Sequence, residues 1–137
     1  MANIRIIENY NTIDLFCGCG GLSKGLQWTG LNILVGIDHW DKAIETYTKN
    51  NRHLGICADI AQLSPEKLHK EYINNENIDV IVGGPPCQGF SMAGKRDKND
   101  PRNSLFMEYV RYLEYYKPKV FLFENVMGIL SMKTASG

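Results

Sequence analysis

Short apolar runs alternate with helical patterns along the chain, and this alternation restricts the fold more than any other feature of the sequence. Apolar runs bounded by turn residues are typical of buried strands, whereas apolar residues repeating every three to four positions indicate helices. Strands that alternate with helices build a parallel sheet with helices on both faces. We expect strands at 12–16, 32–38, 55–58, 79–83 and 120–124, and helices at 22–28, 41–50, from Ser64 onward and at 104–116.

The predicted fold class is therefore α/β, with a doubly wound, mostly parallel sheet. The 137 residues suit one domain with a single core. Hydrophobic residues make up 44% and charged residues 22%, which is an ordinary globular composition. The formal net charge is zero, so the chain as a whole does not attract polyanions. Nucleic-acid binding would need a local basic patch or further polypeptide.

No segment has the pattern of an export signal or a membrane span. The amino-terminal residues include Arg5 and Glu8, where a signal peptide would be apolar. No apolar run approaches the length that crosses a bilayer. We expect a cytoplasmic protein without membrane contact, at the nucleoid or in a nucleus according to its source.

The segment Gly84-Pro85-Pro86-Cys87 follows the apolar run 80–83 and holds a thiol at the end of a predicted strand. Two prolines fix φ near −65° and remove two backbone donors, so the loop has few conformations. A free Cys is usually a small buried hydrophobe, but packing alone requires neither these prolines nor the Gln-Gly-Phe-Ser that follows. Cys87 is therefore a candidate nucleophile. No metal site is expected, because Cys17 and Cys19 have no paired Cys or His elsewhere.

A glycine-rich turn and two acids follow the first three predicted strands. Gly18, Gly20 and Gly21 would let backbone N–H groups approach a ligand. Asp38 could accept hydrogen bonds from ribose hydroxyls. Trp40 could pack on an adenine face, and an acid after the third strand, Asp59, could accept from an exocyclic amine. No phosphate-binding Gly-Lys-Ser/Thr motif is present, so an adenosine ligand without a pyrophosphate, such as S-adenosylmethionine, fits better than NAD.

These blocks, in this order, resemble the cytosine-C5 DNA methyltransferase family over nearly the whole chain. The resemblance implies the Rossmann-like fold of S-adenosylmethionine-dependent methyltransferases, with S-adenosylhomocysteine as the product. The residues that carry it are Asp14-Leu15-Phe16, Gly18, Gly20-Gly21, Asp38, Trp40, Asp59-Ile60, 84–91, Arg102-Asn103, Leu105-Phe106 and Glu124-Asn125-Val126.

The resemblance also implies catalytic roles. Cys87, as thiolate, would add to C6 of a flipped-out cytosine, which makes C5 nucleophilic. Glu124 would bond N3 of the base, with a pKa raised by burial. Pro86 and Asn125 would fix the geometry of the loop around Cys87.

Two sets of binding residues are carried over by position. The cofactor contacts would be Phe16, Gly18, Gly20, Gly21, Asp38, Trp40, Asp59, Ile60, Pro86 and Leu105. A loop contacting DNA would include Gln88, Ser91, Lys95, Arg96, Lys98 and Arg102. Asp38 departs from the family, which more often has Glu at this position.

The family continues beyond Glu124-Asn125-Val126 with blocks that this chain does not contain. We therefore expect 1–137 to be a partial catalytic and cofactor-binding domain, a truncated fold with little activity alone. Sequence-specific recognition of double-stranded DNA would lie elsewhere, for example on a second chain, and self-association is expected. Two alternatives stay open: a tRNA cytosine-C5 methyltransferase, and a non-catalytic remnant that binds cofactor or a partner. A nicotinamide oxidoreductase is disfavoured, because hydride transfer requires neither of the two motifs around Cys87 and Glu124.

Overall fold

The computed structural model describes residues 10–86 and 104–125, which form five strands and four helices in strict alternation. The order is β1 (Asn11–Leu15), α1 (Gly21–Trp28), β2 (Asn32–Asp38), α2 (Asp41–Asn50), β3 (Leu54–Cys57), α3 (Pro65–Glu71), β4 (Val80–Gly83), α4 (Ser104–Tyr116) and β5 (Val120–Phe123). The predicted alternation is confirmed, and no predicted boundary differs from the observed one by more than one residue.

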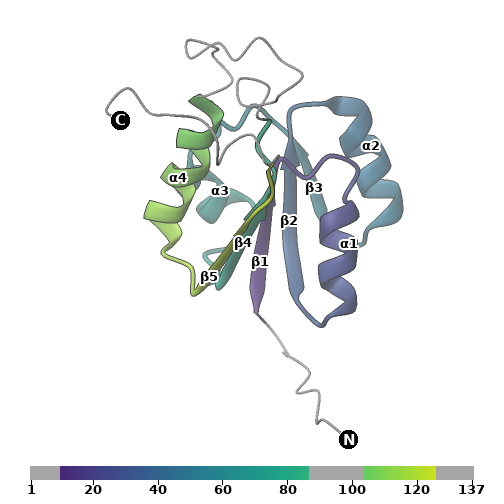
Figure 1. Ribbon diagram of the computed structural model, residues 1–137, viewed down its shortest axis with the longest axis horizontal. Coiled ribbons are helices and arrows are strands. Elements are labelled where there is room, and N and C mark those ends of the chain that lie inside the picture. The colour runs from purple at the N-terminus through teal and green to yellow at the C-terminus, as the bar shows by residue number, and fades with distance from the viewer. Residues whose placement is uncertain (1–9, 87–103, 126–137) are drawn as a thin grey trace, which may run out of the picture.

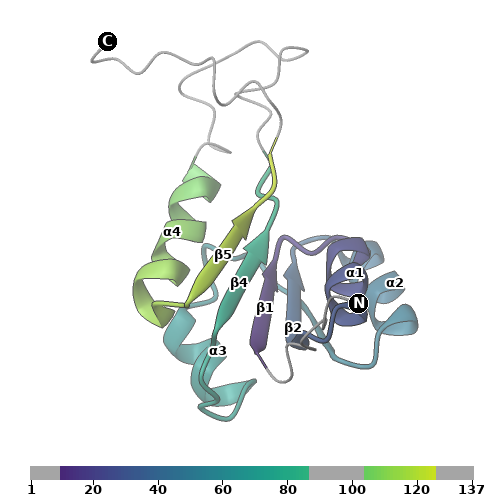
Figure 2. The same cartoon turned by 60° about the horizontal axis from the view of Figure 1, so that its bottom comes forward.

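The five strands form one parallel sheet in the order β3-β2-β1-β4-β5. After β3 the chain crosses back over the sheet to β4, which lies on the other side of β1. As a result α1 and α2 cover one face, and α3 and α4 cover the other (Figure 1 and Figure 2). This arrangement confirms the doubly wound α/β prediction, and the change of direction between β1 and β4 is where such sheets bind ligands.

The central strands β1, β2 and β4 are largely buried on both faces, as is usual in a parallel sheet covered by helices. Side chains from the three central strands form the middle of the core and are at most 1% exposed: Ile13, Leu15, Val35, Ile37, Ile81 and Val82. The register aligns Leu15 with both Ile37 and Gly83, so the central strands end at one level. Residues following these strands are therefore brought together at one edge of the sheet.

The first strand ends at Leu15, one residue earlier than predicted. Phe16 has a φ of 60°, a left-handed conformation that cannot continue a strand. This change turns the chain out of the sheet and into the glycine turn. The side chain of Phe16 packs against the core and also lines a cavity at this edge of the sheet.

Tyr47 of α2 is fully buried and packs against glycines of three different segments. A Cβ atom added at Gly36 would lie 2.3 Å from Tyr47 Cζ, and one at Gly20 would lie 2.6 Å from Tyr47 Cδ2. A Cβ at Gly55 would lie 3.0 Å from Tyr47 Cδ1. The tyrosine ring thus fills the space that these missing side chains leave between α2, β2, β3 and the glycine turn.

Strand β5 forms one edge of the sheet in the described part of the chain. It pairs with β4 on one side, and α4 packs on it through Tyr109, whose hydroxyl donates to the backbone O of Leu122 at 3.0 Å. Val120 and Phe121 nevertheless remain 59% and 58% exposed. Within 10–86 and 104–125, no helix is long and apolar enough to cross a membrane.

Candidate functional site

A cavity of about 660 Å³ opens at the carboxyl ends of the strands, near the change of direction between β1 and β4. Residues following β1, β2, β3 and β4 line it together with the first turn of α4. The lining residues are Phe16, Ile37, Asp38, His39, Trp40, Ala58, Asp59, Ile60, Gly84, Pro86 and Leu105.

Seven of the predicted cofactor contacts therefore lie around one cavity: Phe16, Asp38, Trp40, Asp59, Ile60, Pro86 and Leu105. The predicted glycines do not line it but form the adjoining turn. Gly18 and Gly20 have φ angles of 53° and 88°, which glycine adopts without strain. Gly20 N donates to Cys17 O at 2.9 Å and closes the turn.

Asp38 ties the glycine turn to the start of α2. Its Oδ2 accepts from Gly18 N at 2.9 Å, and its Oδ1 accepts from Trp40 N at 2.9 Å. Each carboxylate oxygen can accept more than one hydrogen bond, so both keep capacity for a ligand hydroxyl. The shorter acid at this position is thus compatible with ribose binding, and it also fixes the backbone on both sides.

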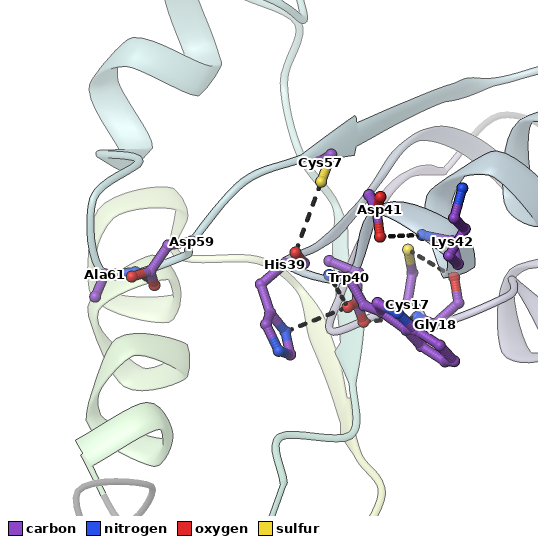
Figure 3. Close-up of polar contacts among 10 residues, drawn as sticks. Cys17, Gly18, His39, Trp40, Asp41, Lys42, Cys57, Asp59 and Ala61 are labelled. Atoms are coloured by element: carbon purple, nitrogen blue, oxygen red, sulfur yellow. Dashed lines mark hydrogen bonds and ion pairs between the residues drawn. The ribbon is translucent and has the colours of Figure 1, made fainter.

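His39 is a cavity residue that sequence reasoning missed. Its Nδ1 lies 3.4 Å from Asp38 Oδ1, a contact drawn as a dashed line from the His39 ring in Figure 3. Trp40, for which we expect packing on an adenine face, also lines the cavity and is 57% exposed. The position of His39 in the sequence could have indicated its place in the cavity, since His39 directly follows Asp38, the acid that ends β2.

The turn after β3 is held by Asp59. Its Oδ1 accepts from Ala61 N at 2.9 Å, and its Oδ2 accepts from Gln62 Nε2 at 3.3 Å. The carboxylate is exposed at the cavity, while the next residue, Ile60, is 4% exposed. An acceptor and an apolar wall therefore adjoin each other, as an adenine with an exocyclic amine would require.

Glu124 lies against the segment that leads to Cys87. Its backbone N donates to Gly83 O at 2.9 Å, and a Cβ added at Gly84 would lie 2.8 Å from Glu124 Oε2. The carboxylate thus lies directly against the backbone of Gly84. The burial that we expected for Glu124 is not present: its side chain is exposed, because no described residue covers it.

Several predicted site residues lie outside the described ranges. They are Cys87, Gln88, Ser91, Lys95, Arg96, Lys98 and Arg102. Pro86 lines the cavity directly before this segment, and Asn125 follows Glu124. Among the described residues, no cluster of His, Cys, Asp or Glu could hold a metal ion.

A chain of buried polar groups runs beneath the glycine turn. Ser23 Oγ donates to Asp14 Oδ2 at 2.6 Å, Tyr47 Oη lies 3.1 Å from Ser23 Oγ, and His53 Nδ1 lies 2.7 Å from Tyr47 Oη. Burial raises the pKa of Asp14 to about 6, against the opposing effect of the Ser23 hydrogen bond. Burial lowers the pKa of His53. When Asp14 is ionised, each hydroxyl donates toward the carboxylate and His53 Nδ1–H donates to Tyr47.

The fold and the cavity together define a nucleoside-binding α/β domain of the kind found in S-adenosylmethionine-dependent methyltransferases. Residues 10–136 match the family of C-5 cytosine-specific DNA methylases. The chain belongs to this family, for which S-adenosylmethionine is the methyl donor.

Two of the relatives are much longer proteins. The chain is 49% identical over 127 residues to the type II methyltransferase M.DdeI of Desulfomicrobium norvegicum, and the match covers 92% of this chain and 30% of that protein. It is 44% identical to the type II methyltransferase M.AgeI of Thalassovita gelatinovora, covering 88% of this chain and 29% of the relative. The chain thus spans about 30% of the length of these two relatives.

Solved structures show the same fold. An E. coli prophage protein described as a DNA modification methyltransferase superposes with a TM-score of 0.80 at 38% identity, covering 92% of this chain and 34% of that chain. A Spodoptera frugiperda DNMT2 variant superposes with a TM-score of 0.67 at 29% identity, covering 90% of this chain and 38% of that chain.

Proposed function

We propose that this chain is the catalytic and cofactor-binding part of an enzyme that methylates C5 of cytosine in DNA. One observation carries the proposal. The cavity that would hold a nucleoside opens where Glu124 contacts Gly84, three residues before Cys87. The proposed base-binding acid and the proposed cofactor site thus belong to adjoining strand ends, and the proposed nucleophile follows Pro86 in the sequence.

The cavity suits S-adenosylmethionine by its chemistry. Phe16, Ile60 and Leu105 offer apolar surface to a purine, and Asp38 offers acceptors to ribose hydroxyls. Among the described residues that line the cavity there are two carboxylates and no Lys or Arg, which disfavours a pyrophosphate and favours a cationic sulfonium. When bound, S-adenosylmethionine supplies a methyl group on a positively charged sulfur and leaves as the neutral thioether S-adenosylhomocysteine.

The proposed reaction begins with a target cytosine flipped out of the duplex. The Cys87 thiolate forms a bond to C6, and the electron pair of the C5–C6 double bond becomes available at C5. Glu124 donates a hydrogen bond to N3 and stabilises the added negative charge. After C5 takes the methyl group, a base removes the C5 proton, the double bond reforms and the Cys87 thiolate leaves.

Supporting roles are proposed for neighbouring residues. Pro86 and Asn125 hold the loop around Cys87. The polar segment after Cys87 contacts DNA through Gln88, Ser91, Lys95, Arg96, Lys98 and Arg102.

The proposal includes a division of labour between this chain and further polypeptide. Sequence-specific base readout is assigned to polypeptide beyond 1–137, on the same protein or on a second chain, because the longer relatives extend far past the matched part. The isolated chain would then transfer little methyl. Because DNA is the proposed acceptor, the proposed place of action is the nucleoid of a cell, or its nucleus.

A chimera tests this function directly. Residues 10–136 would replace the matching segment of M.DdeI, and transfer of labelled methyl from S-adenosylmethionine to duplex DNA and to tRNA would be measured. We expect label in DNA that disappears with Cys87→Ala. Label in tRNA alone would establish the RNA alternative, and label that survives Cys87→Ala would refute the covalent mechanism. A folded chimera that binds cofactor without transferring methyl would favour the non-catalytic alternative.

A further inference from the structure

Helix α4 reaches the turn after β3 through three long side chains. Arg111 Nη2 donates to Ile60 O at 2.7 Å and to Leu63 O at 3.2 Å. Tyr112 Oη donates to Leu63 O at 2.8 Å, and Tyr116 Oη donates to Pro65 O at 3.0 Å. These bonds join residues about fifty positions apart in the sequence, so they connect two elements that the backbone does not connect locally.

The turn to which Arg111 donates hydrogen bonds forms one wall of the cavity. Asp59 and Ile60, which follow β3, line the cavity on this side, and Leu105 lines it from the first turn of α4. The carbonyl of Ile60 belongs to the Ile60–Ala61 peptide unit, whose N–H donates to Asp59 Oδ1 at 2.9 Å, so holding this unit also holds the Asp59 side chain. Arg111 is therefore the link between the two elements that enclose this end of the cavity.

The guanidinium is itself held in place. Glu108, one turn earlier on α4, puts Oε2 at 2.7 Å from Arg111 Nη2. The guanidinium carbon lies 5.7 Å from the centroid of the Tyr112 ring, which is fully buried. A charged donor to a backbone carbonyl makes a stronger bond than a neutral donor. Arg111 is thus suited to fixing the turn, and a mere surface charge would need none of these contacts.

We propose that Arg111 is a positioning residue that sets purine selectivity by holding the Asp59–Ile60 turn. It acts through Asp59 and does not touch the ligand. The inference rests on the proposed function, because it assumes that the cavity takes the adenosine part of S-adenosylmethionine. When Arg111 holds the carbonyls of Ile60 and Leu63, Asp59 faces the exocyclic amine of adenine. Without these Arg111 hydrogen bonds the apolar walls of the cavity remain, and the site no longer prefers a purine with an amino group over one with an oxo group.

The ratio of the affinities for two ligands distinguishes a positioning role of Arg111 from a general effect on folding. The 137-residue chain would be titrated by calorimetry with S-adenosylhomocysteine and with S-inosylhomocysteine, which carries an oxo group in place of the adenine amine. A smaller folded fraction weakens both ligands by the same factor and leaves their ratio unchanged. We expect the unmodified chain to prefer S-adenosylhomocysteine by about tenfold or more, as sites that pair with a polar ligand group do.

Arg111→Met keeps the length of the side chain and removes its donors. We expect the preference to fall to within about threefold, chiefly through weaker binding of S-adenosylhomocysteine. Arg111→Lys should keep part of the preference, since an ammonium can reach one carbonyl. Tyr116→Phe is the matched control: it removes a bond from α4 to the same segment, but at Pro65, away from the cavity, and should leave the ratio unchanged.

Each outcome decides something specific. A preference that persists in Arg111→Met, or that falls equally in Tyr116→Phe, overturns the role of Arg111. If the unmodified chain binds neither ligand, the proposed cofactor site fails, and this inference fails with it. If Arg111→Met does not fold, as judged by circular dichroism, Arg111→Lys decides: a preference equal to that of the unmodified chain overturns the role of Arg111, and a reduced preference supports it.

Discussion

Tyr47 shows how a single side chain can join the parts of the cofactor site. Its ring fills space left by glycines of the glycine turn, of β2 and of β3, and its hydroxyl takes part in the buried chain from Asp14 to His53. These contacts connect α2 with the segments that carry Gly18, Asp38 and Asp59. The glycines at 20, 36 and 55 are therefore required by packing against Tyr47, and at Gly20 also by backbone conformation.

Gly36→Ala should strongly destabilise the chain. The added Cβ would lie 2.3 Å from Tyr47 Cζ, and neither the central strand nor the buried ring can move freely. We expect a loss of at least about 2 kcal/mol in the free energy of unfolding, measured by urea denaturation. Gly25→Ala is the control: nothing lies within 4 Å of its added Cβ, and in helix α1 it should stabilise by about 0.5–1 kcal/mol. Equal effects at the two sites would contradict this packing argument.

Asp14 should make stability depend on pH. Burial raises its pKa from 3.8 to about 6, so the folded state holds the proton more tightly than the unfolded state. This contribution to stability is fully present below about pH 4 and is lost as the pH rises through 6, a change of about 3 kcal/mol. Asp14→Asn cannot ionise, so its unfolding free energy relative to the unmodified chain should rise over this range. Parallel pH profiles for the two proteins would argue against an ionisable, buried Asp14.

At the level of helices and strands, local patterns in the sequence carried most of the information. Mainly apolar runs bounded by turn residues identified the strands, because the central strands of a parallel sheet are buried on both faces. Ser64 and Pro65 correctly marked the start of α3, since both act on the adjacent backbone. The acids after β2 and β3 were assigned to the site for the same reason: parallel strands bring their carboxyl ends to one edge.

The features that sequence reasoning missed depend on contacts between distant segments. Arg111 reaches Ile60 across 51 positions, and no local pattern marks it as more than a helix surface residue. The position of His39 in the cavity depends on how the chain leaves β2. The exposure of Glu124 depends on which residues pack over the end of β5, and the sequence around Glu124 does not determine this.

The start of α3 offers a direct test of helix capping. Ser64 Oγ accepts from Lys67 N at 3.1 Å, which satisfies a backbone donor that the helix itself cannot pair. Ser64→Ala should cost about 1 kcal/mol in unfolding free energy, whereas Ser64→Asp should restore most of it. Thermal and urea unfolding would measure both. An alanine variant as stable as the unmodified chain would show that this hydrogen bond contributes nothing.

At the scale of the whole molecule, β5 is an edge strand of the described sheet and carries exposed apolar side chains. Its residues Val120 and Phe121 are more than half exposed, and strands with free edges and apolar side chains tend to pair with other chains. We expect the 137-residue chain to associate with itself in sedimentation velocity runs at increasing concentration. Phe121→Lys should shift it toward the monomer, because a charge on an edge strand opposes pairing. A stable monomer at every concentration would contradict this expectation.

The most direct test of the central claim is a comparison of ligands for the cavity in the 137-residue chain. Calorimetric titration with S-adenosylhomocysteine, ATP and NAD would be carried out on the unmodified chain and on Asp38→Ala, which loses the acceptors for Gly18 N and Trp40 N. We expect one binding site for S-adenosylhomocysteine, with an affinity at least about tenfold lower in Asp38→Ala. We expect ATP and NAD, which both carry a pyrophosphate, to bind much more weakly. Tighter binding of ATP or NAD, or affinity for S-adenosylhomocysteine that does not depend on Asp38, would contradict these expectations.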